Sequence, residues 1–148
     1  MPPILVDTNV LVYFYDQNSP EKQERASLVL NQLRESGLGR LSTQTLAEFV
    51  NAAMRKLDPP LTAAQAMEQA SLFAASWPVL DLTPQIVLEA ARGVRDHGLA
   101  YYDAQIWAAA RLNQIPVVFT EDFQDGQILE GIRFANPFAA AFDLEAWL

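Results

Sequence analysis

The sequence contains no cysteine among its 148 residues. This absence excludes disulfide bridges, thiolate zinc sites and cysteine nucleophiles, and it suits a reducing compartment. Histidine is scarce as well, because His97 is the only one. A metal site in this chain would therefore have to use oxygen ligands.

Long apolar runs and basic charge are also lacking. No apolar stretch approaches the roughly 18 residues of a membrane helix, and the opening MPPILVD has no basic segment typical of a secretion signal. We therefore expect a cytoplasmic protein. Ten basic residues against eighteen acidic ones give a net charge of −8, which disfavours non-specific attraction to phosphate backbones. A nucleic-acid partner is compatible with this charge only if many carboxylates gather around cations.

The apolar pattern predicts strands that alternate with helices in a single domain over residues 1–148. Apolar or β-branched runs predict strands at 4–7, 79–82, 117–120 and 132–134, with a short strand or turn near Leu41. Capping residues, prolines and glycines predict helices at 8–15, 19–37, 45–58, 62–76, 83–98 and 102–113. A terminal amphipathic helix is expected over 137–148. This alternation implies an α/β sandwich with a mainly parallel sheet.

Two acids follow predicted strands directly. Asp7 ends the first strand, and Asp122 comes just after the strand VVFT. The carboxyl ends of neighbouring parallel strands meet at one rim of the sheet, where such folds collect ligands. Each acid also has an ordinary structural interpretation, Asp7 as a helix N-cap and Asp122 as a turn residue.

Two further acids lie on predicted helices. Asp103 shares an apolar helical stripe with Ile106 and Trp107, where a carboxylate needs a partner, a proton or a metal. The alternative is that Asp103 caps its helix. For Glu48, the spacing from Thr45 fits a capping box, and locally a cap is the favoured interpretation.

Together, the four acids are expected to converge at the rim, because helices of a parallel α/β sheet also begin there. Their mutual repulsion would require cations. Oxygen ligands without cysteine or clustered histidine select Mg²⁺ or Mn²⁺, and the chemistry that fits is phosphodiester hydrolysis without a histidine base. His97 precedes Gly98 at a helix end, where an interaction with the helix dipole is its expected role.

The segments that carry these acids resemble the PIN-domain family, and most closely its VapC-type toxin ribonucleases. A late RFANPF segment is similar to the closing strand of that family. The ordered motifs are LVDTNVLVY with Asp7, STQTLAEFVN with Glu48, LAYYDAQIWAAA with Asp103, and VVFTEDFQDG with Asp122.

This resemblance implies a three-layer α/β/α fold and a Mg²⁺- or Mn²⁺-dependent endoribonuclease, the toxin of a type II toxin–antitoxin system. It also implies a homodimer and inhibition by a small antitoxin protein bound over the acidic groove. The resemblance does not specify which RNA is cut.

The resemblance further implies the roles of individual residues. The catalytic acids would be Asp7, Glu48, Asp103 and Asp122, of which all but Glu48 are expected as direct metal ligands. Supporting positions would be Thr8, Asn9, Thr120 and Asp125. Because Glu121 and Asp125 flank Asp122, either could replace it as the fourth ligand.

Three alternatives fit parts of the sequence. A haloacid-dehalogenase phosphatase needs a second aspartate where this chain has Asn9. A receiver domain needs a lysine beyond a late strand, but the only lysines, Lys22 and Lys56, lie in predicted helices. A catalytically silent PIN-like scaffold that binds RNA or protein would be favoured by loss of an acid, and all four positions are filled.

Overall fold

The computed structural model describes all 148 residues and has a six-stranded central sheet in the order β3-β2-β1-β4-β6-β5. β1 (Ile4–Val6) pairs in parallel with β2 (Gly39–Ser42) on one side and with β4 (Val117–Phe119) on the other. β3 (Val79–Leu80) and β6 (Ile132–Ala135) extend the sheet in parallel beyond β2 and β4. The mainly parallel sheet expected from the sequence is confirmed.

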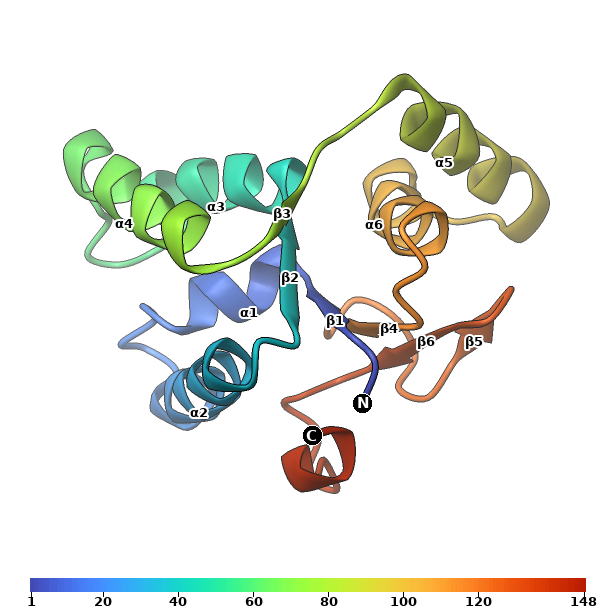
Figure 1. Ribbon diagram of the computed structural model, residues 1–148. Coiled ribbons are helices and arrows are strands. Elements are labelled where there is room, and N and C mark those ends of the chain that lie inside the picture. The colour runs from blue at the N-terminus through green and yellow to red at the C-terminus, as the bar shows by residue number, and fades with distance from the viewer.

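Six helices accompany the sheet, and Figure 1 shows them in two groups. The first group comprises α1 (Thr8–Tyr13), α2 (Pro20–Ser36), α3 (Thr43–Arg55) and α4 (Ala63–Ser76). The second comprises α5 (Pro84–His97) and α6 (Tyr101–Leu112), on the other side of the sheet. No helix combines the length and the apolar composition needed to cross a lipid bilayer.

Alternation along β1 divides the interior into two cores. Ile4 and Val6 belong to a core of 18 buried residues shared with α1, α2 and α3. Leu5 points to the opposite face and belongs to a core of 13 buried residues, which includes Trp107 and Phe134. Successive side chains of a strand face opposite sides, so a three-residue strand serves both layers. The α/β/α arrangement follows from this alternation.

Local signals position most helix ends as predicted. Pro20 occupies the first position of α2, and Gly37 ends that helix in the left-handed conformation, with φ of 73°. Thr62 and Gln65 form the predicted capping box of α4. The Thr62 and Gln65 side chains and the Gly37 N–H pair with backbone groups that a helix leaves open at its ends, whereas Pro20 has no N–H to leave open.

The start of α3 corrects one prediction. The capping box consists of Ser42 and Thr45, not of Thr45 and Glu48. Ser42 is extended at the end of β2, so the helix begins immediately after it, and Thr45 reaches back to the Ser42 N–H. Glu48 therefore lies inside α3, and the capping interpretation of this acid is wrong.

The C-terminal segment departs most from the prediction. In place of a helix over 137–148, only Leu144–Trp147 forms a 3₁₀ turn. Asn136 Oδ1 accepts the Phe138 N–H and Asp143 Oδ1 accepts the Glu145 N–H, and such side-chain bonds compete with helix formation. The unpredicted strand β5 (Ile128–Leu129) pairs antiparallel with β6.

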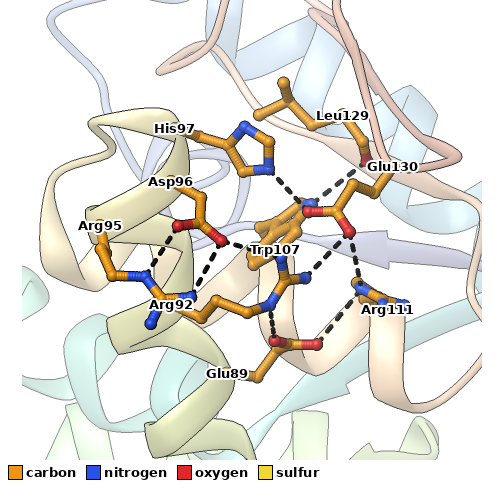
Figure 2. A network of polar contacts seen from close by, with 9 residues as sticks. All are labelled: Glu89, Arg92, Arg95, Asp96, His97, Trp107, Arg111, Leu129 and Glu130. Carbon is orange, nitrogen blue, oxygen red and sulfur yellow. Dashed lines mark hydrogen bonds and ion pairs between the residues drawn. The ribbon is translucent and has the colours of Figure 1, made fainter.

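A network of ionic contacts joins α5 and α6 to the turn between β5 and β6 (Figure 2). Glu130 in that turn accepts hydrogen bonds from Arg92 at 2.9 Å and contacts His97 Nε2 at 2.6 Å. Arg92 and Arg111 both pair with Glu89 as well. The only histidine is therefore part of this network.

Candidate active site

Asp7 lies at the junction of β1 and α1 and is the N-cap of that helix. Its Oδ1 accepts the Thr8 N–H at 2.7 Å, and its Oδ2 accepts the Thr120 hydroxyl at 2.8 Å. Burial raises the pKa of Asp7 to about 7, an effect that these hydrogen bonds oppose and that the charges of Asp122 and Glu48 increase. The cap interpretation is therefore correct, and burial makes the ionised form of this carboxyl unfavourable.

The end of β4 lies directly beside Asp7, because Val6 and Phe119 are register partners of two parallel strands. The Thr120 hydroxyl accepts the Asp122 N–H at 3.1 Å. Asn9 Nδ2 donates to Thr120 Oγ1 at 3.3 Å and to Asp122 Oδ2 at 3.2 Å. Asn9 and Thr120 thus link the segments that follow β1 and β4.

Glu48 approaches the same place from the middle of α3. Its Oε1 accepts the Thr8 hydroxyl at 3.1 Å and the Gln44 side-chain amide at 3.1 Å. No hydrogen bond involves its Oε2. One oxygen is held while the other keeps its lone pairs free.

Asp103 comes from the opposite side of the sheet, as the third residue of α6. The helix N-cap is Ala100, which makes no side-chain cap bond, so the interpretation of Asp103 as a cap is wrong. Burial raises the pKa of Asp103, and the negative charges of Asp122 and Glu48 raise it further. The effect of these two carboxylates indicates that Asp103 lies within electrostatic reach of both.

All four acids line one pocket of about 440 Å³. Asp7, Glu48, Asp103 and Asp122 form no ion pair with any Lys, Arg or His, and these four acids line the pocket beside Thr8, Asn9, Gln44 and Lys56. Like charges this close repel one another unless a cation neutralises them. The pocket therefore favours positively charged ligands.

The two other acids near Asp122 have different surroundings. Glu121 also lines the pocket, but Lys22 Nζ pairs with its Oε2 at 3.0 Å and the Tyr13 hydroxyl donates to its Oε1 at 2.7 Å. Asp125 is not a lining residue, and its Oδ1 accepts the Asn136 N–H at 2.9 Å. Of the three candidates, only Asp122 both lines the pocket and has no basic partner.

The donor set suits a hydrated divalent cation. No group of three or more His, Asp or Glu side chains is arranged as a finished metal cage. Mg²⁺, however, usually keeps several waters and is held through one or two carboxylates. Asn9 Oδ1 is in addition buried without a hydrogen-bond partner, an unused acceptor beside the acids. The residues present therefore fit Mg²⁺ or Mn²⁺ that retains part of its water.

Sequence reasoning named Glu121 as a possible ligand but missed other pocket residues, Gln44 and Tyr13 among them, and the pairing of Glu121 with Lys22. Gln44 precedes Glu48 by four positions on one helix, and this spacing was a usable signal. Tyr13, Lys22 and Glu121 are brought together by the fold alone, since Lys22 and Glu121 are 99 positions apart. No local pattern could have identified that pair.

Comparison with known proteins agrees with this architecture. The PIN domain family model matches residues 4–124, a range that contains all four acids. No curated protein sequence resembles the chain closely enough to count as a match.

Several solved structures share the fold at low sequence identity. A toxin–antitoxin complex from Klebsiella pneumoniae has 18% identity and a TM-score of 0.65, covering 90% of this chain and 97% of that one. DNA-bound VapBC from Salmonella typhimurium has 20% identity and a TM-score of 0.65, with 93% and 99% covered. VapC20 of Mycobacterium tuberculosis, described as a sarcin-ricin loop cleaving toxin, has 19% identity and a TM-score of 0.61, with 88% and 98% covered. Because the family model spans the chain from β1 to the turn after β4, this chain belongs to the PIN domain family.

Proposed function

We propose that this chain is a Mg²⁺- or Mn²⁺-dependent endoribonuclease that acts as the toxin of a type II toxin–antitoxin system. One observation carries the proposal: four carboxylates from four separate segments line one pocket, and none has a basic partner. The similarity in fold to toxin–antitoxin complexes and to a loop-cleaving VapC toxin supports the choice of RNA as substrate. The expected place of action is the cytoplasm.

Asp7, Asp103 and Asp122 would hold the cation in this mechanism. When bound, a divalent ion lowers the pKa of a water ligand and stabilises negative charge on phosphate oxygens. Glu48 Oε2, which has no hydrogen-bond donor, would accept the proton of the attacking water. Thr120 and Thr8 hold the carboxylates of Asp7 and Glu48 by donating hydroxyl hydrogen bonds. His97 takes no part, because it contacts Glu130 in a separate network.

The test uses purified protein and a labelled RNA with a single-stranded loop. Cleavage should require Mg²⁺ or Mn²⁺ and stop in EDTA. Asp7→Asn and Asp103→Asn should each lower the rate by about a hundredfold or more, beyond the 10- to 100-fold typical of residues behind metal ligands. Exposed Asp81 gives the control Asp81→Asn, which should cleave like wild type. Full activity of both site variants would remove the assignment, and metal binding without any cleavage would favour the silent scaffold.

We further propose a small antitoxin partner and a homodimer. An acidic pocket favours a partner segment with arginine or lysine, since a guanidinium can pair with two carboxylate oxygens and occupy the place of the cation. Such a segment should suppress metal uptake and cleavage together. Co-expression of the adjacent reading frame should restore growth arrested by this chain and yield a co-purifying complex. Harmless expression of this chain alone, with no binding neighbour, would contradict the toxin role but not the nuclease activity.

A further inference from the structure

Two buried glutamines link α3 and α6 beside the acidic pocket, Gln44 in its lining and Gln105 behind it. Gln44 is 7% exposed and Gln105 is 4% exposed. A buried amide costs free energy unless its donors and acceptors are paired. Gln105 Nε2 donates to Gln44 Oε1 at 2.9 Å, so each side chain supplies a partner for the other.

In the hydrogen bonds of these amides, each residue donates to the next one closer to the acids of the pocket. The Tyr101 hydroxyl donates to Gln105 Oε1 at 2.9 Å, which leaves the Gln105 amide group facing Gln44. Gln44 Oε1 is then occupied as an acceptor, and its Nε2 donates to Glu48 Oε1 at 3.1 Å and to the Tyr102 carbonyl at 3.0 Å. Each bond thus fixes the orientation of the next amide.

The final two bonds act on both sides of the pocket. Gln44 and Thr8 together occupy Glu48 Oε1, so Glu48 Oε2 is the oxygen without a hydrogen bond. The bond to the Tyr102 carbonyl holds the first turn of α6, directly before Asp103. Gln44 is therefore tied both to an acid on α3 and to the backbone beside an acid on α6.

We propose that Gln44 and Gln105 are positioning residues, which set the orientation of Glu48 and its distance from Asp103 for cation binding and RNA cleavage. The inference rests on the nuclease function proposed above. Neither glutamine would touch the RNA. Partners that orient the groups of a metal site typically change affinity or activity 10- to 100-fold when removed.

The hydrogen bonds that run from Gln105 through Gln44 to Glu48 and to the Tyr102 carbonyl are called the relay below. The variants Gln44→Met and Gln105→Met test it, since methionine fills a similar volume without hydrogen-bonding strongly. Gln69→Met is the matched control. Gln69 lies on α4, outside the lining of the acidic pocket, and its Oε1 accepts a 2.6 Å hydrogen bond from the Tyr15 hydroxyl. Mn²⁺ affinity is measured by electron paramagnetic resonance of the free ion, and folding by circular dichroism and melting temperature without metal. Gln44→Met should bind Mn²⁺ on the order of tenfold more weakly, because it loses the bond to the Tyr102 carbonyl that holds the backbone beside Asp103. Gln105→Met should show a smaller loss, because the Gln44 amide can still reach Glu48, and Gln69→Met should match wild type.

Cleavage kinetics give the second measurement. The relay should affect kcat and not the KM for RNA, and raising Mn²⁺ should partly restore the rate of Gln44→Met. Wild-type Mn²⁺ affinity and kcat in both relay variants would overturn the proposal, and so would a lower melting temperature with unchanged Mn²⁺ affinity. If Gln44→Met does not fold, Gln105→Met decides alone. A wild-type protein that neither binds Mn²⁺ nor cuts RNA would instead overturn the proposed function, and the relay with it.

Discussion

The hydroxyl of Thr120 donates a 2.8 Å hydrogen bond to Oδ2 of Asp7, across the junction between β4 and β1. The Thr120 hydroxyl oxygen also accepts hydrogen bonds from the Asn9 side-chain amide and from the backbone N–H of Asp122. The Thr120 side chain, which is 1% exposed, thus holds both the buried carboxylate of Asp7 and the loop that carries Asp122. Removing this hydroxyl should disturb stability and chemistry together.

Thr120→Val keeps the shape of the side chain and removes that hydroxyl. The free energy of unfolding should fall by about 1–3 kcal/mol, because a buried charged acceptor loses a donor. Cleavage should fall about tenfold, as for other residues that orient a metal ligand. Thr83→Ala is the control, since it removes the N-cap of α5 at a cost of about 1 kcal/mol and should leave cleavage intact. Urea unfolding and initial rates check both, and unchanged cleavage in Thr120→Val would count against the role of this hydroxyl.

Asp7→Asn should make the metal-free protein more stable at high pH relative to wild type. Burial raises the pKa of Asp7 from 3.8 to about 7, so the folded state keeps this proton when the unfolded state has lost it. The free energy of unfolding therefore decreases as pH rises from about 4 to about 7. Urea unfolding in EDTA should show the advantage of Asp7→Asn growing between about pH 4 and about pH 7. If the difference in unfolding free energy between Asp7→Asn and wild type did not change with pH, the raised pKa of Asp7 would be contradicted.

Glu48→Gln and Ser42→Ala should separate catalysis from helix capping. Ser42→Ala removes the cap of α3 and should cost about 1 kcal/mol of stability. Glu48→Gln should leave the melting temperature nearly unchanged and lower cleavage strongly, because Glu48 lies inside the helix. Thermal melts and initial rates give the comparison, and a loss of stability in Glu48→Gln equal to that of Ser42→Ala would restore the capping interpretation.

Glu130→Gln should weaken the network of Figure 2 without affecting cleavage. Hydrogen bonds from Arg92 and His97 lower the pKa of Glu130 from 4.5 to about 2. The stability it contributes is therefore present above pH 4.5 and is lost as pH falls toward 2. The difference in unfolding free energy between variant and wild type should shrink over this interval. A difference that stays constant down to pH 2 would contradict an ionic role.

The sequence predicted those parts of the fold that depend on local chemistry. Pro20, Gly37 and Thr62 mark helix ends through their own backbone and side-chain preferences, and the structure has them there. The convergence of Asp7 and Asp122 on one pocket depends on a further step, the parallel pairing of the strands before them. That pairing follows from the alternation of strands and helices along the chain.

Other features depend on tertiary placement and could not be predicted locally. The alanines of 139–141 favoured a terminal helix, but Phe142 and Trp147 pack against Phe119 of the first core, and this docking outweighs helix propensity. The capping box of α3 was predicted at Thr45 and Glu48, but the end of β2 places the start of the helix earlier, at Ser42. Neutralisation of Glu121 by Lys22 depends on how α2 packs, which no motif encodes.

Because the interior is divided into two cores, the acids that line the pocket come from elements that pack in different cores. Glu48 lies on α3, which packs in the first core, and Asp7 follows β1, which contributes to both cores, whereas Asp103 lies on α6 in the second. Regions with separate apolar contacts can open independently, at less than the free energy of global unfolding. A transient separation of α5 and α6 from the sheet would carry Asp103 away while the other three acids remained in place. Amide hydrogen exchange in α6 faster than in β1 would indicate that the pocket opens locally without global unfolding. The proposed cation, held by acids of both cores, would oppose this opening.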